Sequence, residues 1–276
     1  MRSLFEVPII AAAEEALLLA RRDLRTFWAS TLVGLPDLGG VGLSDWRVGQ
    51  TDVDLHCDEI IRNALAKVLP EVEIVSEESI PRTSRPTGFC FLIDPVDATH
   101  NASAGYPAFT SCVALYDGDR YIFGWVYDIG RDVIYSAASK QGAYLQSSIM
   151  LKRLRVKADA PLERMAVSVL RTRVLTGRMT RIISESGKLR ISSCSSLDMC
   201  LIAAGTLDAF VDLNEPGHER TCDIAAASVI LQEAGGNIFT TMGSQRQLLP
   251  PGLEAVHDYQ SLIAAPSLVG ASNFIL

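Results

Sequence analysis

The chain has 276 residues, of which 48% are hydrophobic and 21% are charged. This composition allows a sizeable buried core, in one large domain or in two fused halves. The formal net charge of -7 argues against a nucleic-acid-binding protein, which needs a basic face to displace counterions from phosphates. A small phosphate ester is not excluded as a substrate, because bound cations reverse the local charge.

The cysteines and the apolar runs indicate the compartment. None of the six cysteines forms a C-x-x-C pair, and most stand among apolar or small residues, as buried thiols do. The four histidines show no metal-ligand spacing, so we expect no structural zinc. No apolar run approaches the ~20 residues that span a bilayer, and the N-terminus lacks a secretory pattern. The sequence therefore predicts a soluble cytoplasmic protein with no membrane or nucleic-acid partner.

The first half of the sequence predicts two helices followed by strands. Apolar residues at helical spacing predict helices over 7–28 and 52–69, and glycines predict a loop over 32–45. Short apolar runs predict strands over 73–75, 89–93, 111–115, 121–126 and 133–136. The strand over 89–93 is expected to stop at Asp94-Pro95.

A stretch rich in basic residues at 150–155 marks the joint between two predicted halves, 1–148 and 149–276. The second half alternates between strand and helix. Strands are predicted over 165–170 and 208–213, and helices over 195–204 and 224–234.

Five carboxylates stand at the ends of these predicted elements, where a rigid scaffold can aim them at one point. They are Asp54, Glu77, Asp94, Asp97 and Asp223. Magnesium prefers oxygen ligands, and phosphoryl transfer needs cations that neutralise the phosphate and activate the attacking water. The backbone carbonyl of Val96 can supply a further oxygen. Carboxylates in this arrangement suit a magnesium-dependent phosphomonoesterase.

Each carboxylate also has a simpler interpretation. Segment 94–97 has the composition of a turn. Asp223 precedes an apolar helix and can be its N-cap, worth about 1 kcal/mol. Glu77 can be a solvated turn residue, whereas Asp54 lies at the edge of an apolar helix face and fits that interpretation less well. Taken singly, these interpretations are at least as good as a metal site, so the surrounding motifs decide.

Two motifs occur in a fixed order. The first is DPVDATHN at 94–101, and the second is CDIAA at 222–226 followed by EAGG at 233–236. An acidic pair, Glu77-Glu78, precedes the first motif. Together they resemble the inositol monophosphatase-like superfamily of lithium-sensitive, magnesium-dependent phosphatases, which has D-P-[LI]-D-G-T-x-N, W-D-x-A-A and E-A-G-G. That superfamily includes fructose-1,6-bisphosphatases and 3′-phosphoadenosine-phosphate phosphatases, and the resemblance covers nearly the whole chain.

The resemblance implies two or three Mg²⁺ ions, with Mn²⁺ as an alternative. Glu77, Asp94 and the Val96 carbonyl would hold the first ion. Asp94, Asp97 and Asp223 would hold the second, and Glu77 would also contact a third, weaker ion.

The resemblance also implies catalytic roles for Thr99, Asp54 and Glu77. Thr99, supported by Asp54, would position and deprotonate the attacking water, without a phospho-enzyme intermediate. Backbone amides at Ala98 and Thr99 would hold phosphate oxygens at a helix N-terminus. For Thr99 an N-cap is the simpler role, and both roles can coexist.

Other residues are predicted to contact the substrate. Ser193 and Ser195 fall in the family's small-residue loop, where the alternative is an ordinary turn or helix cap. Asp212 ends a strand whose last acidic residue contacts substrate hydroxyls in the family, and a solvated strand end is an equal alternative. Arg220, or Arg171 and Arg173, is predicted to reach a second anionic group, although solvated surface is the commoner fate of arginine.

Three residues depart from the family motifs. Ala98 replaces a glycine and would be strained if that position requires a positive φ. Ala102 replaces an aromatic residue, and Cys222 replaces the tryptophan before Asp223. The metal-ligand side chains are retained, so the departures bear on substrate preference.

The resemblance implies a layered αβαβα fold of the α+β class, with a large mainly antiparallel sheet and a second smaller sheet. The predicted function is hydrolysis of a small sugar, cyclitol or nucleoside-type phosphate, by a homodimer on analogy alone. The alternatives are an adenosine bisphosphate 3′-nucleotidase, or a catalytically weakened member that acts through protein binding.

Overall fold

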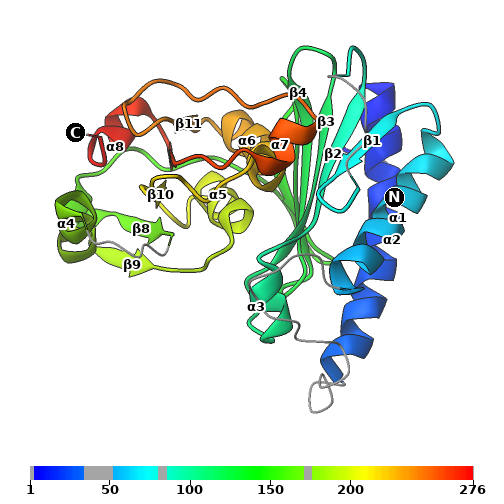
Figure 1. The fold of residues 1–276 in the computed structure, drawn as a ribbon, viewed down its shortest axis with the longest axis horizontal. Helices are drawn as coiled ribbons and strands as arrows, with labels where there is room; N and C mark the ends of the chain where they lie inside the picture. Colours follow the sequence, from blue (N-terminus) through cyan, green and yellow to red (C-terminus); the bar gives the residue numbers. More distant parts are fainter. Residues whose placement is uncertain (1–2, 34–51, 80–85, 171–175, 276) are drawn as a thin grey trace.

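The computed structural model of the chain describes residues 3–33, 52–79, 86–170 and 176–275. Helices and sheets alternate in five layers, which follow one another from right to left in Figure 1. The predicted α+β fold with a large, mainly antiparallel sheet and a second, smaller sheet is confirmed.

The first sheet has seven strands that pair in chain order, and only β1 and β2 are parallel. The inner strands are buried on both faces, which is why they read as continuous apolar runs without alternation. The strands are β1 (Glu73–Ser76), β2 (Cys90–Asp97), β3 (Thr110–Tyr116), β4 (Tyr121–Asp128), β5 (Val133–Ala138), β6 (Gly142–Gln146) and β7 (Leu151–Arg153).

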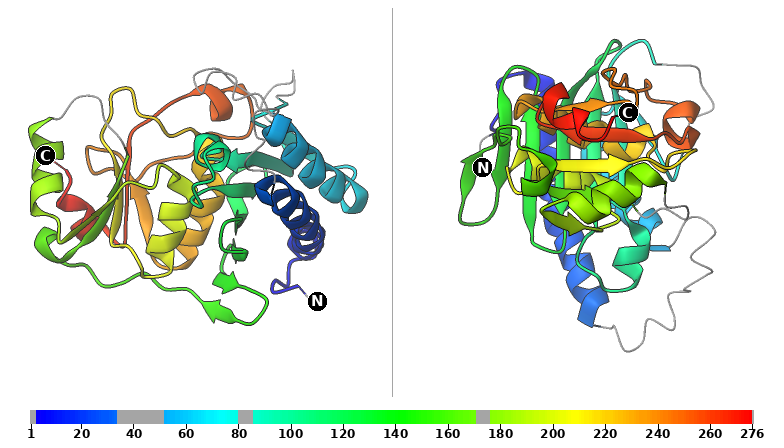
Figure 2. Two further views of the ribbon diagram at one scale, coloured as in Figure 1. Left: turned by 90° about the horizontal axis from the view of Figure 1, so that it is seen from below. Right: turned by 90° about the vertical axis from the view of Figure 1, so that its left-hand side faces the viewer.

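Two helices cover the outer face of this sheet. They are α1 (Pro8–Val33) and α2 (Asp52–Val68), and they lie side by side in Figures 1 and 2. Their apolar stripes, with Leu17 and Leu24 on α1 and Ile61 on α2, are buried in a core shared with the sheet.

The second sheet has five strands in the order β11-β12-β10-β8-β9, with β8, β9 and β10 parallel. Its strands are β8 (Ala166–Val169), β9 (Lys188–Arg190), β10 (Ala209–Asp212), β11 (Asn237–Phe239) and β12 (Leu262–Ala265). Its outer face carries α4 (Gly177–Glu185) and α8 (Leu268–Ser272), whose apolar residues share a core with the strands.

Two buried helices, α5 (Ser195–Ala203) and α6 (Thr221–Glu233), lie between the sheets. Most of their residues are buried, so both helices are covered on every side and are largely apolar. Helix α6 approaches β4 so closely that a Cβ at Gly124 would lie 2.1 Å from the carbonyl oxygen of Ala226. This contact fixes the start of α6 against the first sheet. The remaining helices are α3 (Thr99–Ser103), α7 (Leu253–His257) and a 3-10 turn at Leu162–Arg164.

The predicted elements differ from the structure mainly at their ends. The predicted loop over 32–45 lies mostly outside the described residues, and its first two residues belong to α1. Strand β2 continues to Asp97 and does not stop at Asp94. Its pairing with β3 shifts register between Asp94 and Asp97, and such an irregularity accommodates Pro95 within a strand. The first sheet ends at Arg153 and the second begins at Ala166, and a division of the chain at 148 stays a prediction.

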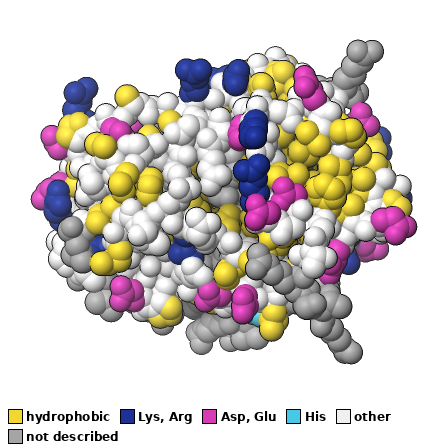
Figure 3. All heavy atoms as spheres, turned by 90° about the horizontal axis from the view of Figure 1, so that it is seen from above, with side chains coloured by type: hydrophobic (Ala, Val, Ile, Leu, Met, Phe, Trp, Pro, Cys, Tyr) yellow, Lys and Arg dark blue, Asp and Glu magenta, His cyan; other side chains and the backbone are white. Residues whose placement is uncertain are grey.

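Within the described ranges, no helix has both the length and the apolar character needed to cross a membrane. On the face shown in Figure 3, acidic and basic side chains are interspersed. An apolar area lies on the right of that face, the side that α1, α2 and β1 occupy in Figure 1.

Candidate active site

The predicted metal ligands come together because the segments that carry them end in one region. Strands β1 and β2 are parallel, and the Glu77 amide donates to the carbonyl oxygen of Ile93 at 3.0 Å. Glu77 therefore lies beside Asp94. Helix α6 brings Asp223 to the same place, since Arg220 contacts both Glu77 and Asp223.

Asp94 is the most buried of these carboxylates and has an oxygen without a partner. Its Oδ1 accepts from the amide of Val96 at 3.1 Å, whereas Oδ2 is buried and, among the described residues, has no hydrogen-bond partner. Burial raises the pKa of Asp94 well above its usual value, and Glu77 and Asp223 raise it further. An unpaired oxygen in a group of carboxylates fits a bound cation, so the residues fit magnesium.

Asp97 is held by the start of α5. Its Oδ2 accepts from the amide of Ser196 at 3.0 Å, from the Ser196 hydroxyl and from the thiol of Cys194 at 3.3 Å. Burial, followed by the charge of Asp223, raises the pKa of Asp97 to about 6 despite these donors. The roles of Cys194 and Ser196 were not predicted. The hydroxyl-rich sequence around them was the available signal, and it was assigned to the substrate.

Thr99 connects α3 to α2. Its Oγ1 lies 2.9 Å from Oδ1 of Asp54 and 3.0 Å from the carbonyl oxygen of Val96. Asp54 is 3% exposed, so its carboxylate is not a solvated helix charge. The hydroxyl has one hydrogen to donate, and when it points to Asp54 its lone pairs can accept a hydrogen from water.

Ala98 has the left-handed backbone conformation that the replaced glycine would favour. Its φ is 68° and its ψ is 48°, at the position before α3. A side chain in this region costs roughly 1–2 kcal/mol, because Cβ approaches the following carbonyl oxygen. Alanine is therefore accommodated with strain, as the sequence predicted for a position that requires positive φ. Ser193 also has a positive φ, 59°.

Arg220 differs most from its simpler interpretation, which was a solvated surface residue. Its Nη2 lies 2.7 Å from Asp223 Oδ1, and its Nη1 pairs with Oε1 of Glu77 at 2.5 Å. Only 17% of its side chain is exposed, so it is not solvated surface. Its guanidinium also lies 5.6 Å from the centre of the Tyr259 ring. The arginine thus places one positive charge among the carboxylates.

The simpler roles considered for Asp223, an N-cap, and for Glu77, a solvated turn residue, do not match the structure. Asp223 is the third residue of α6 and not its N-cap, and its side chain accepts from the backbone amide of Arg220 at 2.8 Å. Burial raises the pKa of Glu77, an effect that Arg220 opposes. Glu77 is thus neither fully solvated nor free of charged neighbours.

Cys222 lies among these side chains, with its sulphur in a group with Glu77 and Asp223 whose ligand atoms are all within 4.8 Å of one another. Burial and then the charge of Asp223 raise the pKa of its thiol well above the usual value. A protonated thiol is a poor magnesium ligand, so the oxygen atoms are the better donors.

The predicted substrate residues have different surroundings. Asp212 is fully buried and accepts from the amides of Asn214 and His218 at 2.9 and 2.6 Å, so the solvated-strand-end alternative is wrong. Ser195 is buried and lies beside Glu219. Ser193, in the loop before α5, is partly exposed. Arg171 and Arg173 lie outside the described residues.

Glu219 is a buried charge that the sequence did not single out. It is 3% exposed, and burial raises the pKa of its carboxyl well above the usual value, with Asp223 adding to the effect. Its backbone pairs with that of Gln260. Because Glu219 stands in a polar loop, its sequence context gave no sign that it is buried.

A family comparison agrees with this geometry. The model of the inositol monophosphatase family matches residues 45–268. The chain belongs to the inositol monophosphatase family. The predicted family and the predicted enzyme class, a phosphoric monoester hydrolase, are therefore confirmed.

Individual relatives support the family assignment. A fructose-1,6-bisphosphatase/inositol-1-monophosphatase of Aquifex aeolicus is 30% identical over 216 residues, which are 75% of this chain and 78% of that protein. A protein named Nus factor SuhB, from Pasteurella multocida, is 28% identical over 226 residues, 79% of each chain. The solved structure of a Thermotoga maritima IMPase matches with a TM-score of 0.74 and 22% identity, covering 94% of this chain and 93% of that one. This last similarity concerns the fold alone.

Proposed function

We propose that the protein is a magnesium-dependent phosphomonoesterase that hydrolyses a small sugar, cyclitol or nucleoside-type phosphate. The observation that carries the proposal is the buried carboxylate group beside the Thr99–Asp54 hydrogen bond, at 2.9 Å. Such a group needs cations to become stable in the charged form, and a hydrolase needs a residue that orients water next to them.

We assign the metal ligands as the motifs suggest. Glu77, Asp94 and the Val96 carbonyl would hold one Mg²⁺, and Asp94, Asp97 and Asp223 a second. A third ion at Glu77 and replacement by Mn²⁺ belong to the same proposal. When bound, the ions neutralise the phosphate and lower the pKa of a bound water.

The chain itself supplies the orientation of the attacking water. With the Thr99 hydrogen directed to Asp54, the Thr99 oxygen accepts a hydrogen from the water and leaves a lone pair of the water toward phosphorus. Asp54 is 3% exposed and is anchored by α2, so it holds this orientation. Proton transfer through such a pair contributes on the order of 10²–10⁴ in rate. Amides at Ala98 and Thr99 are proposed to bind the phosphate oxygens.

Substrate contacts are proposed for Ser193, Ser195, Asp212 and Arg220. Ser195 and Asp212 have the hydroxyl and carboxylate groups that bind the hydroxyls of a sugar or cyclitol, and Asp212 already accepts from the amides of Asn214 and His218. Arg220 already pairs with two carboxylates, so it contacts a second phosphate only if those carboxylates bind metal and release it. An adenosine bisphosphate is the alternative substrate that uses this contact.

A role through protein binding is the second candidate. It is favoured by the strained Ala98 at the predicted phosphate cradle and by the similarity to a protein named Nus factor SuhB. The two candidates differ in turnover. We also propose a homodimer and a reducing cytoplasmic location, the latter supported by six free, buried cysteines.

The decisive experiment measures phosphate release from a panel of sugar, cyclitol and nucleotide phosphates, with and without Mg²⁺ and lithium. Asp94→Asn should lower magnesium-dependent kcat by at least about 10²–10³-fold, since it removes charge next to both proposed ions. Asp198→Asn, a buried aspartate outside the proposed ligand set, is the matched control and should retain activity. Release from no substrate would reject the phosphatase and favour protein binding. Near-normal activity of Asp94→Asn would reject the shared-ligand assignment.

A further inference from the structure

A second charged site lies at the other end of β10. There, a hollow of about 380 Å³ opens beside the starts of β8 and β9. Asp208 precedes β10 and lines the hollow, whereas Asp212 ends the strand on the side of the proposed substrate site. They are four positions apart along an extended strand, roughly 13 Å. The hollow is therefore distinct from the candidate active site.

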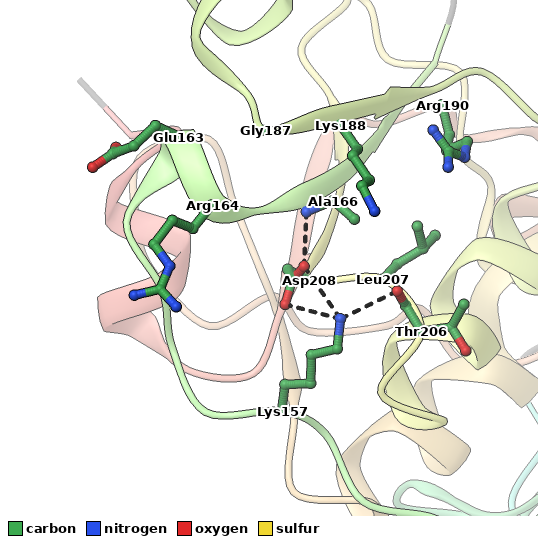
Figure 4. A pocket seen from close by; sticks show the side chains of 10 residues that line it. All are labelled: Lys157, Glu163, Arg164, Ala166, Gly187, Lys188, Arg190, Thr206, Leu207 and Asp208. Atoms are coloured by element: carbon green, nitrogen blue, oxygen red, sulfur yellow. Dashed lines mark hydrogen bonds and ion pairs between the residues drawn. The ribbon is translucent and has the colours of Figure 1, made fainter.

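The wall of the hollow is fixed by backbone and carboxylate contacts. Asp208 accepts from the amide of Ala166 at 2.7 Å and donates its own amide to the Ala166 carbonyl at 2.9 Å. The amine of Lys157 lies 3.4 Å from the Asp208 carboxylate and 3.3 Å from the Thr206 carbonyl oxygen. Lys157 is thus held at the hollow in a defined position (Figure 4).

A close backbone approach fixes the opposite wall. A Cβ at Gly187 would lie 2.6 Å from the carbonyl oxygen of Glu163, so this position requires glycine. The amide of Gly187 donates to Leu162 at 3.2 Å, and that of Lys188 donates to Met165 at 2.9 Å. These bonds hold the turn before β8 against the start of β9. Arg164, from the first segment, and Lys188, from the second, both line the hollow.

Cations outnumber carboxylates around the hollow. Lys157, Arg164, Lys188 and Arg190 line it, with only Asp208 and Glu163 opposing them. Asp208 is engaged by Lys157, and Glu163 points away from the hollow in Figure 4. Arg164, Lys188 and Arg190 form no ion pair with any residue that the structure describes. A local excess of two positive charges occurs in a chain whose net charge is -7.

We propose that this hollow binds the phosphate group or groups of a small molecule, independently of the candidate active site. Unpaired cations that share a hollow repel one another, and an anion between them removes that repulsion. Guanidinium groups bind phosphate through two parallel hydrogen bonds, and lysines add point charges. The volume suits one small ligand and not a polymer.

The test is a titration of the full-length protein with Mg²⁺ present, followed by backbone amide NMR. The probes are inorganic phosphate and methylenediphosphonate, a diphosphate analogue that resists hydrolysis. We expect saturable shifts at the amides of Ala166, Gly187 and Lys188 with both probes. The diphosphonate should bind more tightly, because two phosphonates engage more of the cations. Shifts confined to the candidate active site would overturn the proposal, as would the absence of saturation at these three amides.

Variants separate this site from the active site. Arg164→Glu combined with Lys188→Glu should weaken binding at the hollow at least about tenfold. Lys67→Glu combined with Lys152→Glu makes the same change of net charge on exposed residues elsewhere and should leave binding unchanged. Asp94→Asn should also leave it unchanged. If the double glutamate variant does not fold, Arg164→Gln with Lys188→Gln replaces it. Undiminished shifts at Gly187 in a folded variant would refute the assignment.

Discussion

The candidate active site and the hollow lie near opposite ends of β10, and each is proposed to bind phosphate with the opposite arrangement of charge. In the candidate active site, Asp94 and Asp97 are buried, and Arg220 forms ion pairs with Glu77 and Asp223. In the hollow near β8, exposed cations outnumber the carboxylates. The first region must bind metal cations before it can hold an anion, whereas the second can attract an anion directly. Removal of magnesium should therefore affect the first region, and added salt the second.

Among the substitutions that test this comparison, Thr99→Ala is expected to have the largest effect. It removes the hydroxyl 2.9 Å from Asp54, so water would lose its orientation and kcat should fall on the order of 10²–10³-fold. Steady-state kinetics with Mg²⁺ would measure kcat and KM separately. Thr99→Ser keeps the hydroxyl and should recover most of the rate.

Binding of methylenediphosphonate at the hollow should be the same in both variants. A fall in that binding would show that the two regions are coupled and would break the comparison. Equal kcat for Thr99→Ala and the wild-type protein would remove Thr99 from the mechanism.

Many of the longer helices and strands followed from apolar periodicity, because it reports burial, whereas the layered fold was implied by the resemblance to the family motifs. Helix α2 begins at Asp52 as predicted, and the helices and strands around both motifs have the predicted type. Strand β2 was predicted too short, since Pro95 normally ends a strand and the register shift that admits it is a property of the pair with β3. Short elements such as β9, with three residues, give no periodic signal.

The sequence predicted the positions of those side chains in the site that belong to the motifs. It did not predict side chains whose position depends on tertiary contacts. Thr99 and Asp54 were paired from the family motif, and the structure joins them by a hydrogen bond. Arg220 was assigned to the substrate, because nothing local reveals that Glu77, more than a hundred residues away in the chain, lies beside it. The cations of the hollow are scattered over the sequence and were not recognised together.

A smaller effect is expected from Asp198→Asn, which tests whether a buried carboxylate is costly without a cation. Asp198 accepts from the hydroxyls of Ser168 and Ser192 at 2.6 Å each, and burial raises its pKa from 3.8 to about 6. This difference corresponds to about 3 kcal/mol of unfolding free energy. The folded pKa is the higher one, so this stability is present below pH 4 and is lost as the pH rises through about 6.

Urea unfolding from pH 4 to 8 would check this. The unfolding free energy of Asp198→Asn should exceed that of the wild-type protein increasingly as the pH rises toward 6 and then remain higher. The same change at Asp119, an exposed turn residue, should give no such trend. If the difference in unfolding free energy between Asp198→Asn and the wild-type protein were constant across the pH range, burial would not raise the pKa of Asp198.

The smallest effect concerns Arg220, the internal cation of the acidic region. Its guanidinium pairs with Glu77 and Asp223, two proposed metal ligands, so it competes with bound metal for their charge. Arg220→Ala should strengthen Mg²⁺ binding to the substrate-free protein by about tenfold, measured by titration calorimetry. Arg220→Lys keeps the charge and should change the affinity less. Replacement of a cation of the hollow by alanine, in Lys188→Ala, should leave the affinity for Mg²⁺ unchanged.

Turnover gives a second measurement on the Arg220→Ala protein. If the arginine moves to a second phosphate once metal is bound, bisphosphates should lose kcat/KM relative to monophosphates. Equal losses for both would remove Arg220 from substrate binding while leaving its competition with metal intact. Unchanged or weaker Mg²⁺ binding would contradict the competition itself. In that case the acidic region would need Arg220 as well as metal to hold its carboxylates together. The difference in charge between the acidic region and the hollow would then be smaller.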